Sequence, residues 1–301
     1  MTLPLLFTWG EFWQQVTSGL AAGAIYASLA LALVLIYQTT NVVNFAQGEM
    51  ATFTTYIAWM LMDRGVPYWP AFALTLLIAF GGGVGVERVL IRPVEHRPEL
   101  VIVILTIGML IALNGLTGWI WGPEVKAFDS PFPNSSVIVG DVAISSRDIG
   151  TFCVCLGIVL ALWLFFRFTT LGLAMRAVAF NPDASRLMGV RVGWMLALGW
   201  GFAAVLGAIA GMMAAPSVFL DPDMMLVILI YAFAAAVLGG IDSPVGAVVG
   251  GLLLGVVINL LGAYVDFVGQ ELRLPTALAV LLVVLIVRPR GLFGRVVVRR
   301  V

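Results

Sequence analysis

The chain alternates long apolar runs with short polar stretches along its whole length. A helix crosses the hydrocarbon core of a bilayer with roughly 20 residues. Nine apolar runs approach that length, at about residues 16–37, 41–62, 70–91, 100–121, 149–166, 194–214, 224–240, 244–264 and 276–288. Because helices satisfy their own backbone hydrogen bonds in lipid, the pattern predicts an all-α, polytopic membrane protein with eight to ten helices.

Two of these runs are weaker than the others. The run at 276–288 is short, and the run at 41–62 carries polar residues in its opening half. We expect one of the two to be interrupted or re-entrant. The composition agrees with a membrane protein, because 61% of the 301 residues are hydrophobic and only 11% are charged. A soluble domain could not bury so much apolar surface, and no basic patch indicates a nucleic-acid partner.

The basic residues are distributed unevenly between the two sides of the predicted bundle. One side receives only Arg64, Lys126, Arg147 and Arg273. The other side receives the remaining twelve, namely Arg88, Arg92, Arg97, Arg167, Arg176, Arg186, Arg191, Arg288, Arg290, Arg295, Arg299 and Arg300. The positive-inside rule makes this second side cytoplasmic. We therefore expect a multi-pass protein of a bacterial inner membrane with a cytoplasmic C-terminus, while the side of the N-terminus stays open.

The longest polar interval, Gly122 to Asp148, divides a single transmembrane domain (residues 1–301) into two halves, about 1–148 and 149–301. Each half ends an apolar run with an arginine-proline pair and contains a glycine-interrupted apolar segment, as transporters built from repeats do. We expect the halves to be weakly repeated. Glycines four residues apart predict close helix packing at Gly19 and Gly23, Gly81 and Gly85, Gly207 and Gly211, Gly246 and Gly250, and Gly251 and Gly255.

Polar side chains at membrane depth are costly and normally face protein or a watery path. The candidates for a translocation pathway are therefore Asn41, Asn44, Gln47, Glu49, Asn114 and Asn259. Glu49 could be a neutral acid that donates a hydrogen bond, or a carboxylate that is kept ionised by an arginine. It could contact the solute directly, or it could be a hydrogen-bonded carboxylate at the start of a helix, and the sequence leaves both questions open. No cluster of metal ligands is visible.

The polar segment Thr169 to Val192, on the arginine-rich side, carries the signals of a short capped helix. Asn181 can cap it, Pro182 suits its first position, Asp183 favours the positive end of the helix dipole, and Gly189 can end it. We expect this helix to expose Arg186 beside small residues, which would form a knob for another protein. A simple interfacial loop is the alternative.

Four stretches carry a family resemblance that covers nearly the whole chain: residues 41–49, 175–189, 238–246 and 288–294. They begin Asn-Val-Val-Asn-Phe-Ala, Met-Arg-Ala-Val-Ala, Leu-Gly-Gly-Ile-Asp and Arg-Pro-Arg-Gly-Leu. The chain resembles the LivH-like permease subunits of branched-chain amino acid ABC importers, a family that also includes urea and short-amide permeases. Ser185 is a small departure, because many relatives carry alanine there.

The resemblance implies two ATPase subunits, a second homologous permease and a periplasmic solute-binding protein as partners. It also implies that a coupling loop, about residues 169–192, docks on an ATPase through Arg176, Asn181, Asp183, Ala184, Arg186, Leu187 and Gly189. ATP and magnesium would be bound by those partners, and no cofactor is expected in this chain. The permease pairing, with a homologue or with a second copy, stays open.

We expect no ATP hydrolysis by this chain, since no glycine-rich run is followed by lysine and a hydroxyl residue. We expect no other enzymatic activity, because no Ser/His/Asp constellation or cluster of metal ligands is visible. The primary hypothesis is a permease subunit of an ATP-driven importer of branched-chain amino acids or a similar small solute. A urea or short-amide permease is the alternative. An ion-coupled secondary transporter that uses Glu49 is a further one, and the exact substrate stays open.

Overall fold

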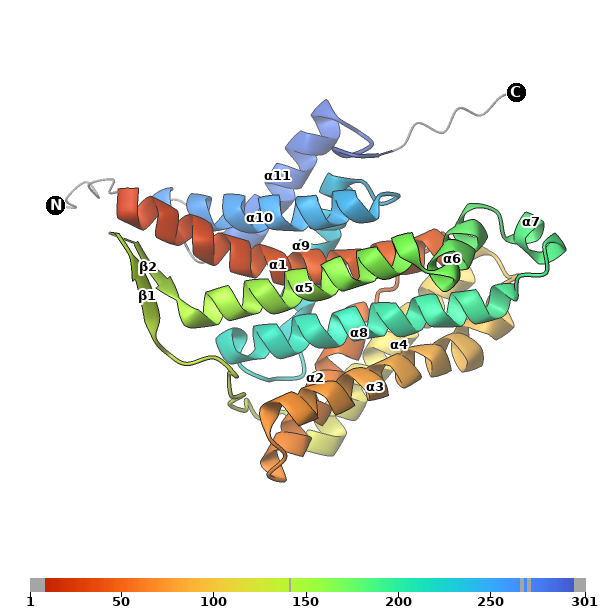
Figure 1. Cartoon of the computed structure of the whole chain (residues 1–301), viewed down its shortest axis with the longest axis horizontal. Coiled ribbons are helices and arrows are strands. Elements are labelled where there is room, and N and C mark those ends of the chain that lie inside the picture. Colours follow the sequence, from red (N-terminus) through yellow and green to blue (C-terminus); the bar gives the residue numbers. More distant parts are fainter. Residues whose placement is uncertain (1–8, 141, 266–267, 270–271, 295–301) are drawn as a thin grey trace.

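The computed structural model describes residues 9–140, 142–265, 268–269 and 272–294, and shows an elongated bundle of helices (Figure 1). Three arginines of the larger basic set, Arg295, Arg299 and Arg300, lie outside the described residues. In chain order the helices are α1 (Trp9–Thr40), α2 (Gln47–Asp63), α3 (Tyr68–Val86), α4 (Glu99–Trp121), α5 (Ser146–Phe168), α6 (Thr170–Phe180), α7 (Pro182–Leu187), α8 (Val192–Val218), α9 (Met224–Gly239), α10 (Pro244–Tyr264) and α11 (Arg273–Val287).

The nine predicted apolar runs correspond to α1 to α5 and α8 to α11. Six helices are long and apolar enough to cross a membrane by length and composition, namely α1, α3 with its extension to Val94, α4, α5, α8 and α10. The others are short: α2 has 17 residues, α9 has 16 and α11 has 15. The run expected at 41–62 starts as a helix only at Gln47, so its opening part is non-helical as its polar residues indicated.

The core of the bundle is formed around α1 and α8. In their most apolar stretches 78% and 83% of the residues are buried, compared with 22% in α4 and 28% in α3 and α5. Large apolar side chains remain exposed on the outer helices, for example Leu77 of α3, Ile111 of α4 and Leu160 of α5. Since no described part of the chain covers these side chains, the exposed faces of the outer helices suit lipid or another subunit.

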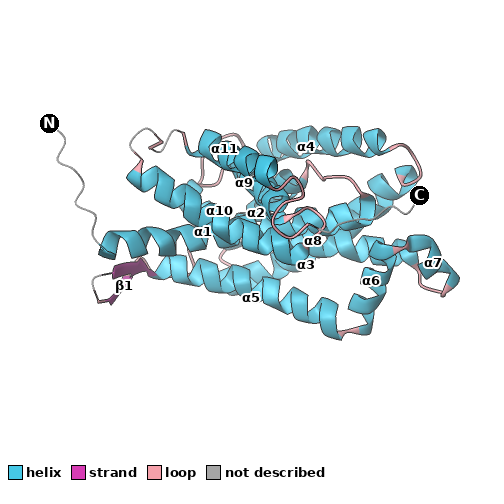
Figure 2. Ribbon diagram, turned by 90° about the horizontal axis from the view of Figure 1, so that it is seen from above, coloured by secondary structure: helices cyan, strands magenta, loops and turns pink. Residues whose placement is uncertain are grey.

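The two ends of the bundle differ in charge. We call the end at which α1, α3 and α5 finish the arginine-rich end, and α6 and α7 project from it (Figure 2). The segment after α11 reaches this end too, because the Leu292 amide donates to the Leu238 carbonyl oxygen (2.8 Å) and the Gln38 side chain donates to the Asp242 carbonyl oxygen (3.0 Å). The described arginines of the larger basic set therefore gather at one end.

A small antiparallel hairpin occupies the opposite end. Its strands, β1 (Ser136–Val139) and β2 (Val142–Ser145), pair Val139 with Val142 and Ser136 with Ser145. The sequence predicts a polar interval over residues 122–148 but does not predict strands within it. The hairpin leads directly into α5 (Figure 1).

Glycines allow the closest helix contacts, as the four-residue spacings predicted. A Cβ atom added at Gly251 would lie 2.5 Å from the Ala27 Cα atom, and one added at Gly19 would lie 2.8 Å from the Val256 Cα atom. The prediction is wrong for Gly81 and Gly85, which face open space. Gly83 instead packs against the Trp200 carbonyl of α8, because the helix is rotated so that this position faces inward.

Candidate functional site

The polar residues before α2 fix the start of that helix inside the bundle. Asn41 ends α1 with a left-handed backbone (φ 55°). The Asn44 side chain accepts a hydrogen bond from the Ala46 amide (3.1 Å) and donates one to Gln47 Oε1 (3.1 Å). Gln47 Nε2 donates to the Ala203 carbonyl oxygen of α8 (2.9 Å). Asn44 and Gln47 are buried, so their polar groups join α2 to α8.

Glu49 lies in the first turn of α2 and meets two other segments. Its side chain is fully buried, and its Oε2 atom lies 3.5 Å from Asn114 Nδ2 of α4. The same amide nitrogen donates to Asp223 Oδ1 (2.8 Å) and contacts the Pro222 carbonyl oxygen (3.3 Å). We call Glu49, Asn114 and Asp223 the acidic cluster. It passes from exposed Asp223 through half-buried Asn114 to buried Glu49.

One carboxylate oxygen of the acidic cluster is free to accept a further hydrogen bond. Glu49 Oε1 is buried and has no partner within the part of the chain that the structure describes. A buried carboxylate oxygen without a donor is unfavourable, and so it suits a donor that arrives from outside the chain. Asp223 was missed by sequence reasoning, although the Asp-Pro-Asp triplet directly before an apolar run is a signal that could have found it.

Asn259 is not part of the acidic cluster, because its hydrogen-bond partners belong to α1. Its amide nitrogen donates to the Gln15 carbonyl oxygen (2.7 Å) and to Gln15 Oε1 (3.0 Å), which joins α10 to the start of α1. Of the six pathway candidates, only Glu49 and Asn114 therefore belong to the acidic cluster, which Asp223 completes. Asn41 lies at the arginine-rich end, beside Glu87 and Arg92.

The predicted capped helix is present as α7. Asn181 Oδ1 accepts a hydrogen bond from the Ala184 amide (2.9 Å), Pro182 occupies the first position, and the chain leaves the helix through Gly189 with φ +80°. Ser185, the departure from the family pattern, is buried, and its hydroxyl donates to the Asn181 carbonyl oxygen (2.8 Å). The hydroxyl thus adds a bond within the helix and does not alter its outer surface.

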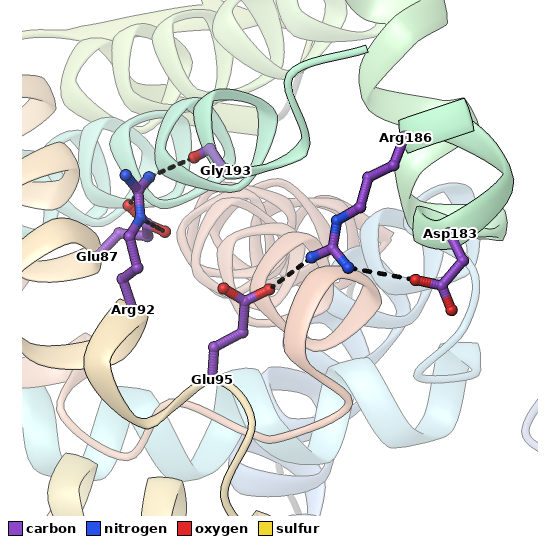
Figure 3. A network of polar contacts seen from close by, with 6 residues as sticks. All are labelled: Glu87, Arg92, Glu95, Asp183, Arg186 and Gly193. Carbon is purple, nitrogen blue, oxygen red and sulfur yellow. Dashed lines mark hydrogen bonds and ion pairs between the residues drawn. The ribbon is translucent and has the colours of Figure 1, made fainter. Parts of the chain in front are cut away.

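Arg186 is turned towards the rest of this chain. Its guanidinium lies 3.2 Å from Asp183 Oδ1 and 3.7 Å from Glu95 Oε1, and Glu95 belongs to the connector between α3 and α4 (Figure 3). Three large apolar side chains project outward from this end: Leu187, Met188 and Phe180 are 90%, 84% and 88% exposed. Leu187 was among the predicted coupling residues, whereas Met188 and Phe180 were not. The other predicted coupling residues, Arg176, Asn181, Asp183, Ala184 and Gly189, are exposed at the same end.

A second ion pair, Arg92 with Glu87, holds the connector between α3 and α4 against α8. Arg92 donates to both carboxylate oxygens of Glu87 (3.2 and 2.9 Å) and to the Gly193 carbonyl oxygen at the start of α8 (2.6 Å; Figure 3). The connector itself contains a π-helical turn (Glu87–Ile91) and a 3₁₀ turn (Arg92–Val94). Arg92 was read from the sequence only as an interface marker, and its pairing with Glu87 was missed.

These features define a multi-pass helical membrane protein of the transport class, with a buried polar cluster between helices and a capped helix outside the bundle. The family model described as the permease component of the branched-chain amino acid transport system matches residues 15–288. The chain belongs to this family. It is therefore a transport component and not an enzyme.

Two bacterial relatives match this chain over nearly its full length, and an archaeal relative matches about three quarters of it. The chain is 33% identical, over 96% of its length and 98% of the relative, to the "High-affinity branched-chain amino acid transport system permease protein LivH" of Salmonella typhimurium. It is also 33% identical to the corresponding protein BraD of Pseudomonas aeruginosa, with 97% and 98% covered. A probable LivH of Methanocaldococcus jannaschii is 30% identical over 78% of this chain and 76% of its own.

Proposed function

We propose that this chain is the membrane-spanning permease subunit of an ATP-driven importer that takes up branched-chain amino acids. The observation that carries this proposal is the match at 33% identity over 96% of the chain to a permease whose name states that substrate class. Urea and short amides are the alternative cargo, but none of the relatives described above carries such a name.

We place the arginine-rich end in the cytoplasm, together with the C-terminus, in the inner membrane of a bacterium. The arrangement of the described arginines at one end supports this orientation through the positive-inside rule. The nine helices that match the apolar runs then make an odd number of crossings, which puts the start of α1 outside. The hairpin of β1 and β2 and the exposed Asp223 face the periplasm, where a solute-binding protein would deliver its cargo.

The partners follow from this assignment. ATP and magnesium are bound by two ATPase subunits, one of which docks on α7, and a second permease, homologous or identical, completes the pathway. The exposed apolar side chains Phe180, Leu187 and Met188 suit such a docking surface, since they lie outside the lipid yet lack cover in this chain. Nucleotide-driven movement of the ATPases would reach the membrane helices as a rigid shift of α7.

The assignment is tested by reconstitution. The four kinds of subunit are copurified in mild detergent and placed in liposomes with ATP inside, and uptake of radiolabelled leucine is followed. We expect accumulation against a gradient that stops when a non-hydrolysable nucleotide replaces ATP. Accumulation by this chain alone, with an ion gradient and no ATPase, would instead identify a secondary transporter. Uptake of urea but not of leucine would show that the alternative cargo is the correct one.

Glu49 gives a residue-level prediction for the pathway. We expect Glu49→Gln to lower leucine uptake about tenfold to a hundredfold, because losing a hydrogen bond to a charged group costs about 1.5–3 kcal/mol. The amide places a donor or a neutral oxygen where the ammonium group of a passing amino acid requires a carboxylate. Initial uptake rates at equal amounts of assembled complex give the measurement.

A matched change elsewhere controls for the loss of a carboxylate. Asp148 of α5 accepts a hydrogen bond from the Ser18 hydroxyl of α1 (2.7 Å) and lies at the other side of the core. Asp148→Asn should change uptake less than about twofold, since it alters a half-buried structural bond only. Equal uptake by Glu49→Gln and wild type would show that the acidic cluster has no part in the pathway.

A further inference from the structure

A cavity of roughly 260 Å³ lies at the arginine-rich end, lined by the end of α1, the α3–α4 connector, the start of α4, α6, α7 and the start of α8. Four aliphatic side chains contribute to its lining, and each is at most 7% exposed: Ile91, Ile102, Val178 and Leu196. A volume of this size exceeds that of a single water, about 30 Å³, and approaches that of a small-molecule site. The lining therefore suits a branched aliphatic group.

The same cavity is lined by a tryptophan with an unused donor. Trp200 of α8 is 1% exposed, and its indole Nε1 has no hydrogen-bond partner among residues that the structure describes. Buried indole N–H groups usually find an acceptor, but this nitrogen is enclosed by protein, so Trp200 offers the cavity its ring and not its donor.

Charged groups of both signs line the cavity (Figure 3). They form one tight pair, Glu87 with Arg92, and one looser group in which Arg186 lies between Asp183 and Glu95. Arg92 is held tightly, because three of its five N–H groups donate to the two oxygens of Glu87 and to the Gly193 carbonyl oxygen. Arg186 contacts the exposed Asp183 at 3.2 Å but is only loosely associated with Glu95, at 3.7 Å, and the Arg186 and Glu95 side chains are 48% and 29% exposed. A group that carries one charge of each sign can satisfy this loose pair, with its anion on Arg186 and its cation on Glu95.

We propose that the cavity binds an aliphatic α-amino acid as a zwitterion. The side chain occupies the aliphatic lining, the carboxylate meets Arg186, and the ammonium group meets Glu95. The identity of the ligand as the transported solute rests on the function proposed above. Because occupancy replaces the direct contact between α7 and the connector, amino acid that has accumulated on this side slows further transport.

The test uses the complete complex in liposomes with ATP and a chosen compound trapped inside, and measures initial uptake of radiolabelled leucine from outside. Millimolar leucine inside should reduce the initial rate at least threefold. Leucinol, which lacks the carboxylate, and 4-methylpentanoate, which lacks the ammonium group, should not reduce it. Two variants fill the cavity from different helices, Ile102→Trp on α4 and Val178→Phe on α6. Met109→Phe, a buried change on α4 that does not line the cavity, is the control.

Inhibition by leucine in wild type and Met109→Phe, lost in either cavity-filling variant that assembles, supports the site. Equal inhibition in the filled variants, or inhibition by leucinol and 4-methylpentanoate alike, overturns it.

The wild-type uptake rate without trapped leucine reports the proposed function separately. If that uptake is absent, binding of radiolabelled leucine to the purified permease–ATPase complex decides the site: binding that Ile102→Trp and Val178→Phe do not weaken overturns it, and binding that both weaken at least tenfold supports it.

Discussion

Gly255→Leu will lower the amount of correctly folded protein at least about tenfold relative to wild type. This decrease corresponds to a loss of more than about 1.4 kcal/mol in the free energy of folding. A Cβ atom at Gly255 would lie 2.5 Å from the Gly19 carbonyl oxygen and would also meet the Gly23 backbone. Overpacking of a core costs about 1–3 kcal/mol when side chains can move aside. Here the obstacles are backbone atoms of α1, so α1 and α10 must separate.

The amount of monodisperse protein after detergent extraction measures this effect, with a fluorescent protein fused to the chain. Gly157→Leu on α5 is the matched control, because a Cβ atom at Gly157 has no neighbour within 4 Å among the described atoms. It should extract as wild type does. A Gly255→Leu protein that is equally abundant and elutes as a single peak would show that the two helices are not held by this close contact.

The membrane spans were predictable because each depends on a local property. Apolar length sets a span, and the nine runs reappear as helices with shifted ends. The cap at Asn181 was equally predictable, since a side chain three residues from its target needs no tertiary information. The weakness of the 41–62 run was visible for the same reason, because polar side chains next to the chain's own amides compete with a helix start.

Contacts between distant segments could not be predicted in this way. Glycine spacing alone suggested Gly81 and Gly85, whereas Gly83 makes the contact, because a spacing does not fix the rotation of a helix about its axis. The acidic cluster joins Glu49 to Asp223, and the Arg186 side chain meets Glu95 from another connector. Each of these pairings depends on how helices far apart in the sequence are placed side by side.

Arg186→Glu should abolish coupled uptake, with a loss of at least tenfold, while membrane insertion and abundance stay as in wild type. The variant places a third negative charge between Asp183 and Glu95, where the arginine now bridges them. Like charges at this range repel and turn α7 away from the connector. The ion pairs are partly exposed and contribute little to stability, so the protein remains folded although α7 is misdirected.

Two further variants separate a positioning role of Arg186 from a general effect of charge. Arg191→Glu reverses an exposed arginine of the same end for which no ion pair is found among the described residues, and it should transport normally. Adding Glu95→Arg to Arg186→Glu restores opposite charges across the gap and should recover part of the uptake. The measurements are leucine uptake and ATP hydrolysis by the same liposomes, because uncoupling leaves hydrolysis without uptake. Full uptake by Arg186→Glu at normal abundance would mean that α7 transmits no force through this residue.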